Sequence, residues 1–325
     1  MAITPKAQLT GLSHLGLALE TTLGTPVAAT GWVPIKPPKP QDVPQFIPDE
    51  GFRGLPYNTY GEYLGTKSST YSVDGMLYPS SGGNFLAAIF GTDTVTGSAN
   101  PYTHTFTVPT TGVAPAYTLS DTYLGPAAVG RQWPGSRCNK LTLKFTPEAG
   151  LSYTAGFIGF PSATYTPEAA TYGTLPFFLG WEAAITFGGA ADANLSSFSL
   201  DLERVGSKAL FSAANTQTPY DIFVGLLKAT WDLEFYMVAD TEYAYALTQA
   251  SEVAVVTITQ PGVNGAVLTL TASALQFTKP TITRQGKWVV VQIAGESFYN
   301  ATDAGILQCK LANAVAISYT TTAAS

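Results

Sequence analysis

Residues 69–78 (STYSVDGMLY) and residues 229–238 (ATWDLEFYMV) decide the fold class of this 325-residue chain. In both stretches large apolar side chains alternate with polar ones, as Tyr71 and Val73 do with their neighbours in the first. A period of two is typical of a β-strand with one buried face. The two stretches therefore predict equivalent strands in the two halves of the chain.

Each of these strands is followed, in the same order, by a short helical pattern and then by a hairpin. The ranges are 84–90 and 141–159 in the first half, and 240–247 and 281–295 in the second. Asn84 and Asp240 stand where helix N-caps are expected. A shared order of elements predicts an internal duplication, because single alternating strands arise easily by chance and an ordered set does not. Two unrelated β-domains of similar composition are the alternative.

The composition favours strands and turns, with 31 Gly, 22 Pro, 17 Tyr and 17 Phe. We expect an all-β fold with short helices, built from two tandem β-sandwich domains that each carry a flanking helix. Charged residues make up only 12% of the chain, about half of the roughly 25% usual in soluble domains. Because subunit interfaces are depleted of charge, this deficit indicates a protein that assembles. A secreted, neutral β-protein is the alternative.

The formal net charge of −6 and the absence of a basic block argue against nucleic-acid binding through phosphate contacts. The N-terminal residues show no signal peptide, and no apolar stretch is long enough to cross a membrane. Cys138 and Cys309 fall in different halves, so they predict no disulfide framework. We expect a soluble protein made in the cytoplasm, with free thiols.

Residues of the types that usually act in catalysis are scarce in this chain. His14 and His104 lie in apolar or strand-like stretches without a partner motif, and Cys138 has no histidine near it in sequence. No metal, phosphate or nucleophile motif is present. We expect no enzyme activity, no cofactor and no metal; a β-rich hydrolase with dispersed carboxylates stays open as an alternative.

Residues 34–56 hold seven prolines, which excludes a central strand and indicates an extended arm or a long loop. As an arm, the segment would reach a neighbouring subunit and be anchored there by its large apolar side chains. These are Phe46, Ile47, Phe52, Leu55 and Tyr57. A mobile loop is the alternative.

The expected domain organisation follows from these segments. It comprises an N-terminal segment with the first strand (1–33), the Pro-rich arm or loop (34–66), the rest of the first domain (67–165), a linker (166–180), and the second domain with a C-terminal arm (181–325).

Three further stretches, in this order, carry a resemblance to a known family. They are residues 17–29 (LALETTLGTPVAA) followed by 32–35 (WVPI), residues 102–107 (YTHTFT), and residues 198–202 (FSLDL) leading to 225–236. Together they resemble the tail tube, or major tail, proteins of long-tailed bacteriophages (siphophages). The long Pro-rich insert departs from the commoner pattern of that group.

The resemblance implies a structural virion protein, made in the host cytoplasm and found in the tail, that forms stacked rings around a channel for genomic DNA. Its implied partners are further copies of itself, the tape measure protein, the tail tip and the tail terminator; DNA passes without specific binding and no membrane is involved. With two tail-tube-like domains per chain, a trimeric, pseudo-hexameric ring is expected, and a true hexamer is the alternative. A β-sandwich adhesin or carbohydrate-binding module is the rival interpretation.

The same resemblance gives candidate residues for the channel wall. Asp74, Asp232 and Glu234 lie on the polar face of the two equivalent strands, where they would repel the phosphates of passing DNA. An outer, solvated sheet face is the alternative.

Overall fold

The structure is a computed structural model that describes residues 10–124, 128–238, 243–244, 247, 251–261 and 265–324. Strands dominate it, which confirms the expected all-β fold class. Among the described residues, no helix is long and apolar enough to cross a membrane.

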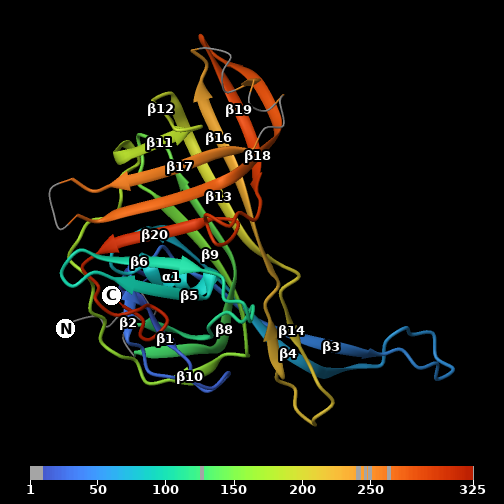
Figure 1. The fold of residues 1–325 in the computed structure, drawn as a ribbon. Coiled ribbons are helices and arrows are strands. Elements are labelled where there is room, and N and C mark those ends of the chain that lie inside the picture. Colours follow the sequence, from blue (N-terminus) through green and yellow to red (C-terminus); the bar gives the residue numbers. More distant parts are fainter. Residues whose placement is uncertain are drawn as a thin grey trace, which may run out of the picture.

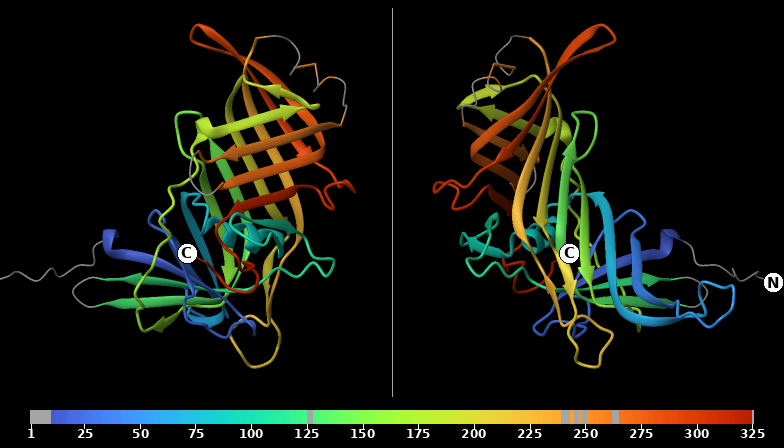
Figure 2. Two further views of the ribbon diagram at one scale, coloured as in Figure 1. Left: turned by 60° about the vertical axis from the view of Figure 1, so that its left-hand side comes forward. Right: turned by 90° about the vertical axis from the view of Figure 1, so that its right-hand side faces the viewer.

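One antiparallel sheet of eight strands runs through both halves of the chain (Figure 2, right). In spatial order the strands are β3 (Lys39–Asp49), β4 (Gly61–Met76), β9 (Ser152–Gly159), β8 (Val129–Phe145), β13 (Leu195–Val205), β16 (Leu226–Tyr236), β19 (Trp288–Ser297) and β18 (Val267–Gln285). We call this the shared sheet. The predicted strands at 69–78 and 229–238 are the inner part of β4 and β16. Their apolar residues face the core, so the opposite face of the sheet is polar.

Each half also has a second layer of strands. In the first half it consists of β1 (Ser13–Leu19), β2 (Gly31–Val33), β7 (Tyr117–Tyr123), β10 (Ala163–Tyr165) and the N-terminal part of β8. In the second half it consists of β11 (Ala183–Phe187), β12 (Ala190–Asp192), β17 (Glu252–Thr259), β20 (Gln308–Asn313) and the N-terminal part of β18, extended by β5 (Thr92–Thr96) and β6 (Tyr102–Thr107). The remaining elements are β14 (Lys208–Leu210) paired with β15 (Asp221–Phe223), and the short 3₁₀ turns η1 (Thr10–Leu12) and η2 (Gly180–Glu182).

The pairing scheme of the first half recurs in the second. Each strand pair of the first half has a counterpart in the second half. The pairs β1–β2, β1–β7, β3–β4 and β4–β9 correspond to β11–β12, β11–β17, β13–β16 and β16–β19. The pairs β7–β8, β8–β9 and β8–β10 correspond to β17–β18, β18–β19 and β18–β20. The irregularities recur as well: β8 has bulges after Trp133 and Cys138, and β18 has them after Ala272 and Phe277 at identical spacing. Bulges are specific features of a sheet rather than noise, so the two halves share one architecture in detail.

The helix α1 (Gly82–Phe90) is buried along its whole length and packs against β8 and β13 of the shared sheet and against β6 (Figure 1). The prediction of a helix here is confirmed, but the expected N-cap is wrong. Ser81 occupies that position, and Asn84 lies inside the helix, where its side chain binds the C-terminal segment instead. Of the second predicted helix (240–247), the structure describes residues 243, 244 and 247, which are helical, and the expected N-cap Asp240 lies outside the described residues.

A single hydrophobic core extends across both halves. Its largest fully buried side chains include Tyr71, Phe85 and Phe157 from the first half and Phe198 and Trp231 from the second. Phe145 stacks on Phe198 at 4.9 Å between ring centroids, directly across the junction of β8 with β13. The predicted hairpins are present as β8–β9 and β18–β19, whereas the junction that joins the halves in one sheet was not predicted.

Candidate functional site

The polar face of the shared sheet brings the three candidate channel residues onto one surface. Residues directly opposite one another in neighbouring strands share a face. A row of such partners crosses six strands, through Asp74, Thr154, Thr142, Asp201, Thr230 and Glu296. Asp232 and Glu234 follow on the same face of β16, where Asp232 is exposed and Glu234 is half-buried.

Acidic residues outnumber basic ones on the part of this face that lies between the edge strands β3 and β18. In the described parts of β4 (from Ser69), β9, β8 (from Lys140), β13, β16 and β19, its carboxylates are Asp74, Asp201, Glu203, Asp232, Glu234 and Glu296, and its lysines are Lys140, Lys144 and Lys228. Asp201, Glu203 and Glu296 were not among the residues predicted for the channel wall. The alternation of β13 places its acids on the polar face, but only the pairing of β13 with β16 shows that this face is shared with Asp232.

Hydrogen bonds and an ion pair hold several of these carboxylates in place. Glu296 pairs with Lys228 Nζ at 3.0 Å. Glu234 accepts hydrogen bonds from Ser196 Oγ and from Gln292 Nε2, both at 2.8 Å. This surface therefore combines carboxylates that have hydrogen-bond or ion-pair partners with Ser, Thr and Gln side chains between them.

The Pro-rich segment forms the outer strand of a hairpin that extends away from the body (Figure 1). In the structure, β3 lies at the edge of the sheet, paired with β4. Exposed apolar side chains cover this hairpin: Phe46, Ile47, Phe52, Leu55, Tyr57, Tyr63 and Leu64, with Phe52 completely exposed. Tyr63 and Leu64 were missed because they lie beyond the prolines, in the returning strand.

A second excursion lies against the base of this hairpin. The connection between β13 and β16 contains β14 and β15, and its Gln217 accepts a hydrogen bond from Lys67 N at 2.7 Å and donates one to Leu64 O at 3.0 Å. Tyr220 and Leu226 are exposed there. Because β13–β16 corresponds to β3–β4, each half extends one long connection toward the same region. No periodic pattern of residues predicted the second connection.

Two strand edges of the shared sheet are open. Among the described residues, β3 pairs only with β4, and the C-terminal part of β18 pairs only with β19. Their counterparts β13 and β8 pair with each other. Exposed edges invite pairing with another chain, so the two ends of this sheet are candidate contact surfaces.

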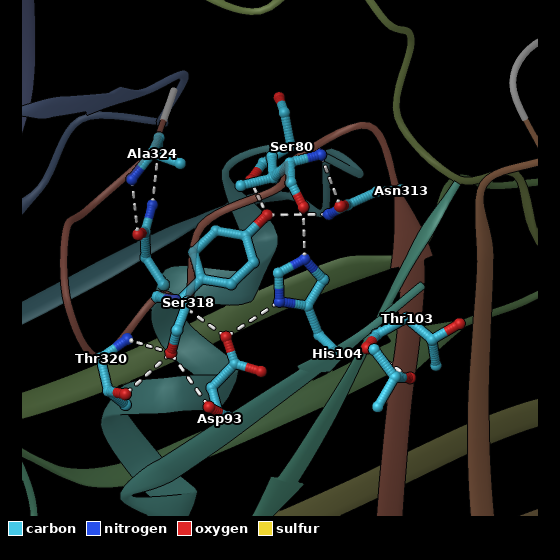
Figure 3. Close-up of polar contacts among 12 residues, drawn as sticks. Ser80, Asp93, Thr103, His104, Asn313, Ser318, Thr320 and Ala324 are labelled. Atoms are coloured by element: carbon cyan, nitrogen blue, oxygen red, sulfur yellow. Dashed lines mark hydrogen bonds and ion pairs between the residues drawn. The ribbon is translucent and has the colours of Figure 1, made fainter. Parts of the chain in front are cut away.

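The residues considered for catalysis are structural. His104 is fully buried, with Nδ1 2.9 Å from Asp93 Oδ2 and Nε2 donating to Val315 O at 2.8 Å (Figure 3). In the same cluster, the Asn84 side chain makes two hydrogen bonds with the backbone of Ala324. This network fastens the C-terminal segment to the first half of the chain.

The other candidates are also poorly placed for chemistry. His14 Nε2 contacts a backbone oxygen, Glu168 O, at 2.9 Å. Burial raises the pKa of the Cys138 thiol to about 12, so it stays protonated and unreactive. In the described part of the chain, no group of His, Cys, Asp and Glu side chains could hold a metal ion.

Comparison with known proteins identifies the family to which this architecture corresponds. A family model described as phage tail tube protein matches residues 11–308. A search of curated proteins finds no match.

Proposed function

The chain belongs to the phage tail tube protein family, so its role is structural and it is a component of the virion tail; from this premise we propose that it polymerises into stacked rings that conduct genomic DNA into the host. The match over residues 11–308 carries the proposal, because it spans both halves of the shared sheet. The protein would be that of a siphophage, made in the host cytoplasm before assembly.

We further propose that the two halves arose by internal duplication and that three chains form one pseudo-hexameric ring. The recurrence of pairing partners and of both β8 bulges in β18 supports the duplication. A heterologous contact repeated around an axis closes into a ring, and stacked rings form an open filament. A ring of six chains is the competing outcome.

The acidic face of the shared sheet suits the channel wall. Asp74, Asp232 and Glu234 lie on it together with Asp201, and carboxylates outnumber lysines on the six strands of this face between β3 and β18. A negative wall repels phosphates, so DNA can slide without sticking sites.

The β3–β4 hairpin suits a contact between subunits. Its exposed Phe46, Ile47, Phe52, Leu55 and Tyr57 form an apolar surface of the kind that marks protein interfaces. Within the tail, the partners proposed for the ends and interior of the tube are the tape measure protein, the tail tip and the tail terminator.

Electron microscopy of the purified full chain at increasing concentration tests the proposal. We expect rings and tubes with a central channel, and three chains per ring by mass measurement. A protein that stays monomeric at high concentration under every condition would contradict the tube.

A matched pair of variants tests the channel wall. Asp232→Lys with Glu234→Lys should leave tubes intact and make them retain DNA in co-sedimentation at low salt. The control, Glu62→Lys with Glu50→Lys on the hairpin, should not retain DNA. Equal retention by both would place the acidic face outside the channel.

A further inference from the structure

Resting on the proposed function, we propose that the outer edge of β3 in one copy of the chain pairs with the C-terminal part of β18 in a second copy, in the register set by the chain's own β8–β13 junction. The contact would be antiparallel and would place Thr281 directly opposite Gln41 of the next copy. It specifies which strands join neighbouring subunits and which residues meet.

The two open edges are the counterparts of the two edges that meet inside the chain. The strand β8 uses residues 140–145 to pair with β13, whereas the equivalent part of β18 pairs, among the described strands, with β19 alone. Likewise β13 has a neighbour on both sides, whereas its counterpart β3 pairs with β4 alone among the described strands. Joining β18 to β3 therefore repeats a contact that this architecture already makes.

Two rows of directly opposite residues fix the register. In the second half the row runs from Phe277 at the β18 bulge through Gly295 and Trp231 to Leu200 of β13. In the first half it runs from Cys138 at the β8 bulge through Phe157 and Tyr71 to Pro40 of β3. Pro40 therefore corresponds to Leu200.

The partner of Leu200 across the internal junction is Leu143, the fifth residue after Cys138. The fifth residue after Phe277 is Ile282, so Ile282 lies opposite Pro40 of the next copy. In an antiparallel pair, Thr281 then lies opposite Gln41 and Pro280 lies opposite Asp42.

The prolines of β3 support an edge with a selective partner. Pro40, Pro44 and Pro48 are spaced by four residues, so the backbone nitrogens of all three, which carry no hydrogen, face the same edge of the strand. Prolines within a sheet occupy positions whose N–H faces away from the partner strand, which here is the open edge. Of residues 40, 42 and 44, only Asp42 has a backbone N–H that can donate a hydrogen bond at this edge.

A donor-poor edge pairs badly with a second copy of itself and better with an edge that supplies N–H groups. In the proposed register Pro40 faces Ile282 and Pro280 faces Asp42, so each proline lies opposite a residue with an N–H. If the β3 strands of two copies instead paired antiparallel with Asp42 opposite Asp42, Pro40 of one copy would lie opposite Pro44 of the other. The prolines thus favour head-to-tail growth over a closed β3–β3 dimer.

Cysteine cross-linking tests the register. Thr281 and Gln41 are both exposed, so Thr281→Cys combined with Gln41→Cys should not disturb folding. Directly opposite antiparallel residues have Cα atoms about 4.5–5.5 Å apart, within the range of a disulfide. The control, Thr281→Cys with Lys39→Cys, is a diagonal pair about 7–8 Å apart, beyond that range.

After mild oxidation of assembled protein, a non-reducing gel should show covalent oligomers for the test pair, at least tenfold more than for the control. Cys138 and Cys309 are buried and give little background. Tubes that form normally while the test pair stays uncross-linked, or cross-links no better than the control, would overturn the register and leave the tube standing. If the wild-type chain forms neither rings nor tubes, the proposed function fails, and this contact fails with it.

A second comparison tests the edge by backbone chemistry. Asp42→Pro removes the remaining N–H of residues 40, 42 and 44, and Asp42→Ala keeps that N–H while removing the same side chain and its bonds to Ser162. We expect tubes from Asp42→Ala and a strong loss of tubes from Asp42→Pro at equal monomer stability. Equal assembly by the two variants would overturn the contact.

Discussion

Arg204 gives the sharpest test of how the two halves are joined. It comes from β13, is 2% exposed, and donates to Ile89 O at 2.8 Å and to Phe90 O at 2.7 Å, the last carbonyls of α1. A helix C-terminus carries partial negative charge and leaves its carbonyls without partners in the helix, so a guanidinium there satisfies both. Burial lowers the pKa of Arg204, yet an arginine stays charged.

Two substitutions separate the charge from the geometry. Arg204→Met removes the charge and leaves two buried carbonyls without donors, at about 1–3 kcal/mol each, so the free energy of unfolding should fall by about 2–6 kcal/mol. Arg204→Lys keeps a charge in the buried site but loses the planar fork that reaches both carbonyls. Breaking the contacts of a buried charge costs about 3–5 kcal/mol. We therefore expect Lys, the conservative change, to destabilise by about as much as Met.

Urea unfolding of unassembled chain, followed by tryptophan fluorescence, measures both variants against wild type. Arg284→Lys is the matched control, because it makes the same change at an exposed position of β18, and it should change the free energy of unfolding by less than about 0.5 kcal/mol. The reasoning is refuted if Arg204→Lys keeps wild-type stability, because the bidentate bond to the helix end would then be dispensable.

Three further substitutions test buried contacts. Burial raises the pKa of Asp121 to about 6, against the hydrogen bond from the Tyr123 hydroxyl that lowers it, so its contribution to stability is present at low pH and is lost as the pH rises through 6. Asp121→Asn should gain about 3 kcal/mol relative to wild type between pH 3.5 and 7.5; a pH-independent difference in melting temperature would contradict this. Gly83→Ala would place a Cβ 2.2 Å from the Tyr319 ring and should destabilise by about 1–3 kcal/mol in thermal unfolding, whereas a neutral effect would mean that the C-terminal segment yields easily. Tyr319→Phe removes the hydroxyl that accepts from Asn313 Nδ2 and should cost about 1–2 kcal/mol by the same measurement, with no loss if that amide finds another partner.

The local patterns of the sequence predicted the local structure well. Alternation at 69–78 and 229–238 predicted strands with the correct buried faces, since period two and burial are properties of a few neighbouring residues. The hairpin β8–β9 was predicted for the same reason: its turn and both strands are adjacent in sequence. The prolines predicted that residues 34–56 avoid the middle of a sheet, and β3 lies at an edge.

Contacts between distant segments were not predictable in this way. Asn84 has the composition of an N-cap in its local context, and only the arrival of Ala324, 240 residues later, makes it a tether for the C-terminal segment. The pairing of β20 with β6 is equally non-local. His104 was assigned correctly to a structural role, but its partners Asp93 and Val315 come from an adjacent strand and from the far end of the chain.

These non-local contacts share one physical consequence. The helix of the first half ends on Arg204 from the second half, its Asn84 binds the C-terminal segment, and β6 completes a sheet of the second half. Each contact leaves buried backbone or side-chain polar groups unsatisfied if the other half is removed, at about 1–3 kcal/mol per group. The internal junction is therefore fixed before any second copy arrives, so the rows that end at Pro40 and Ile282 reach the surface in a defined register. A chain built this way presents one edge poor in donors and one edge with donors, which gives a growing ring its direction.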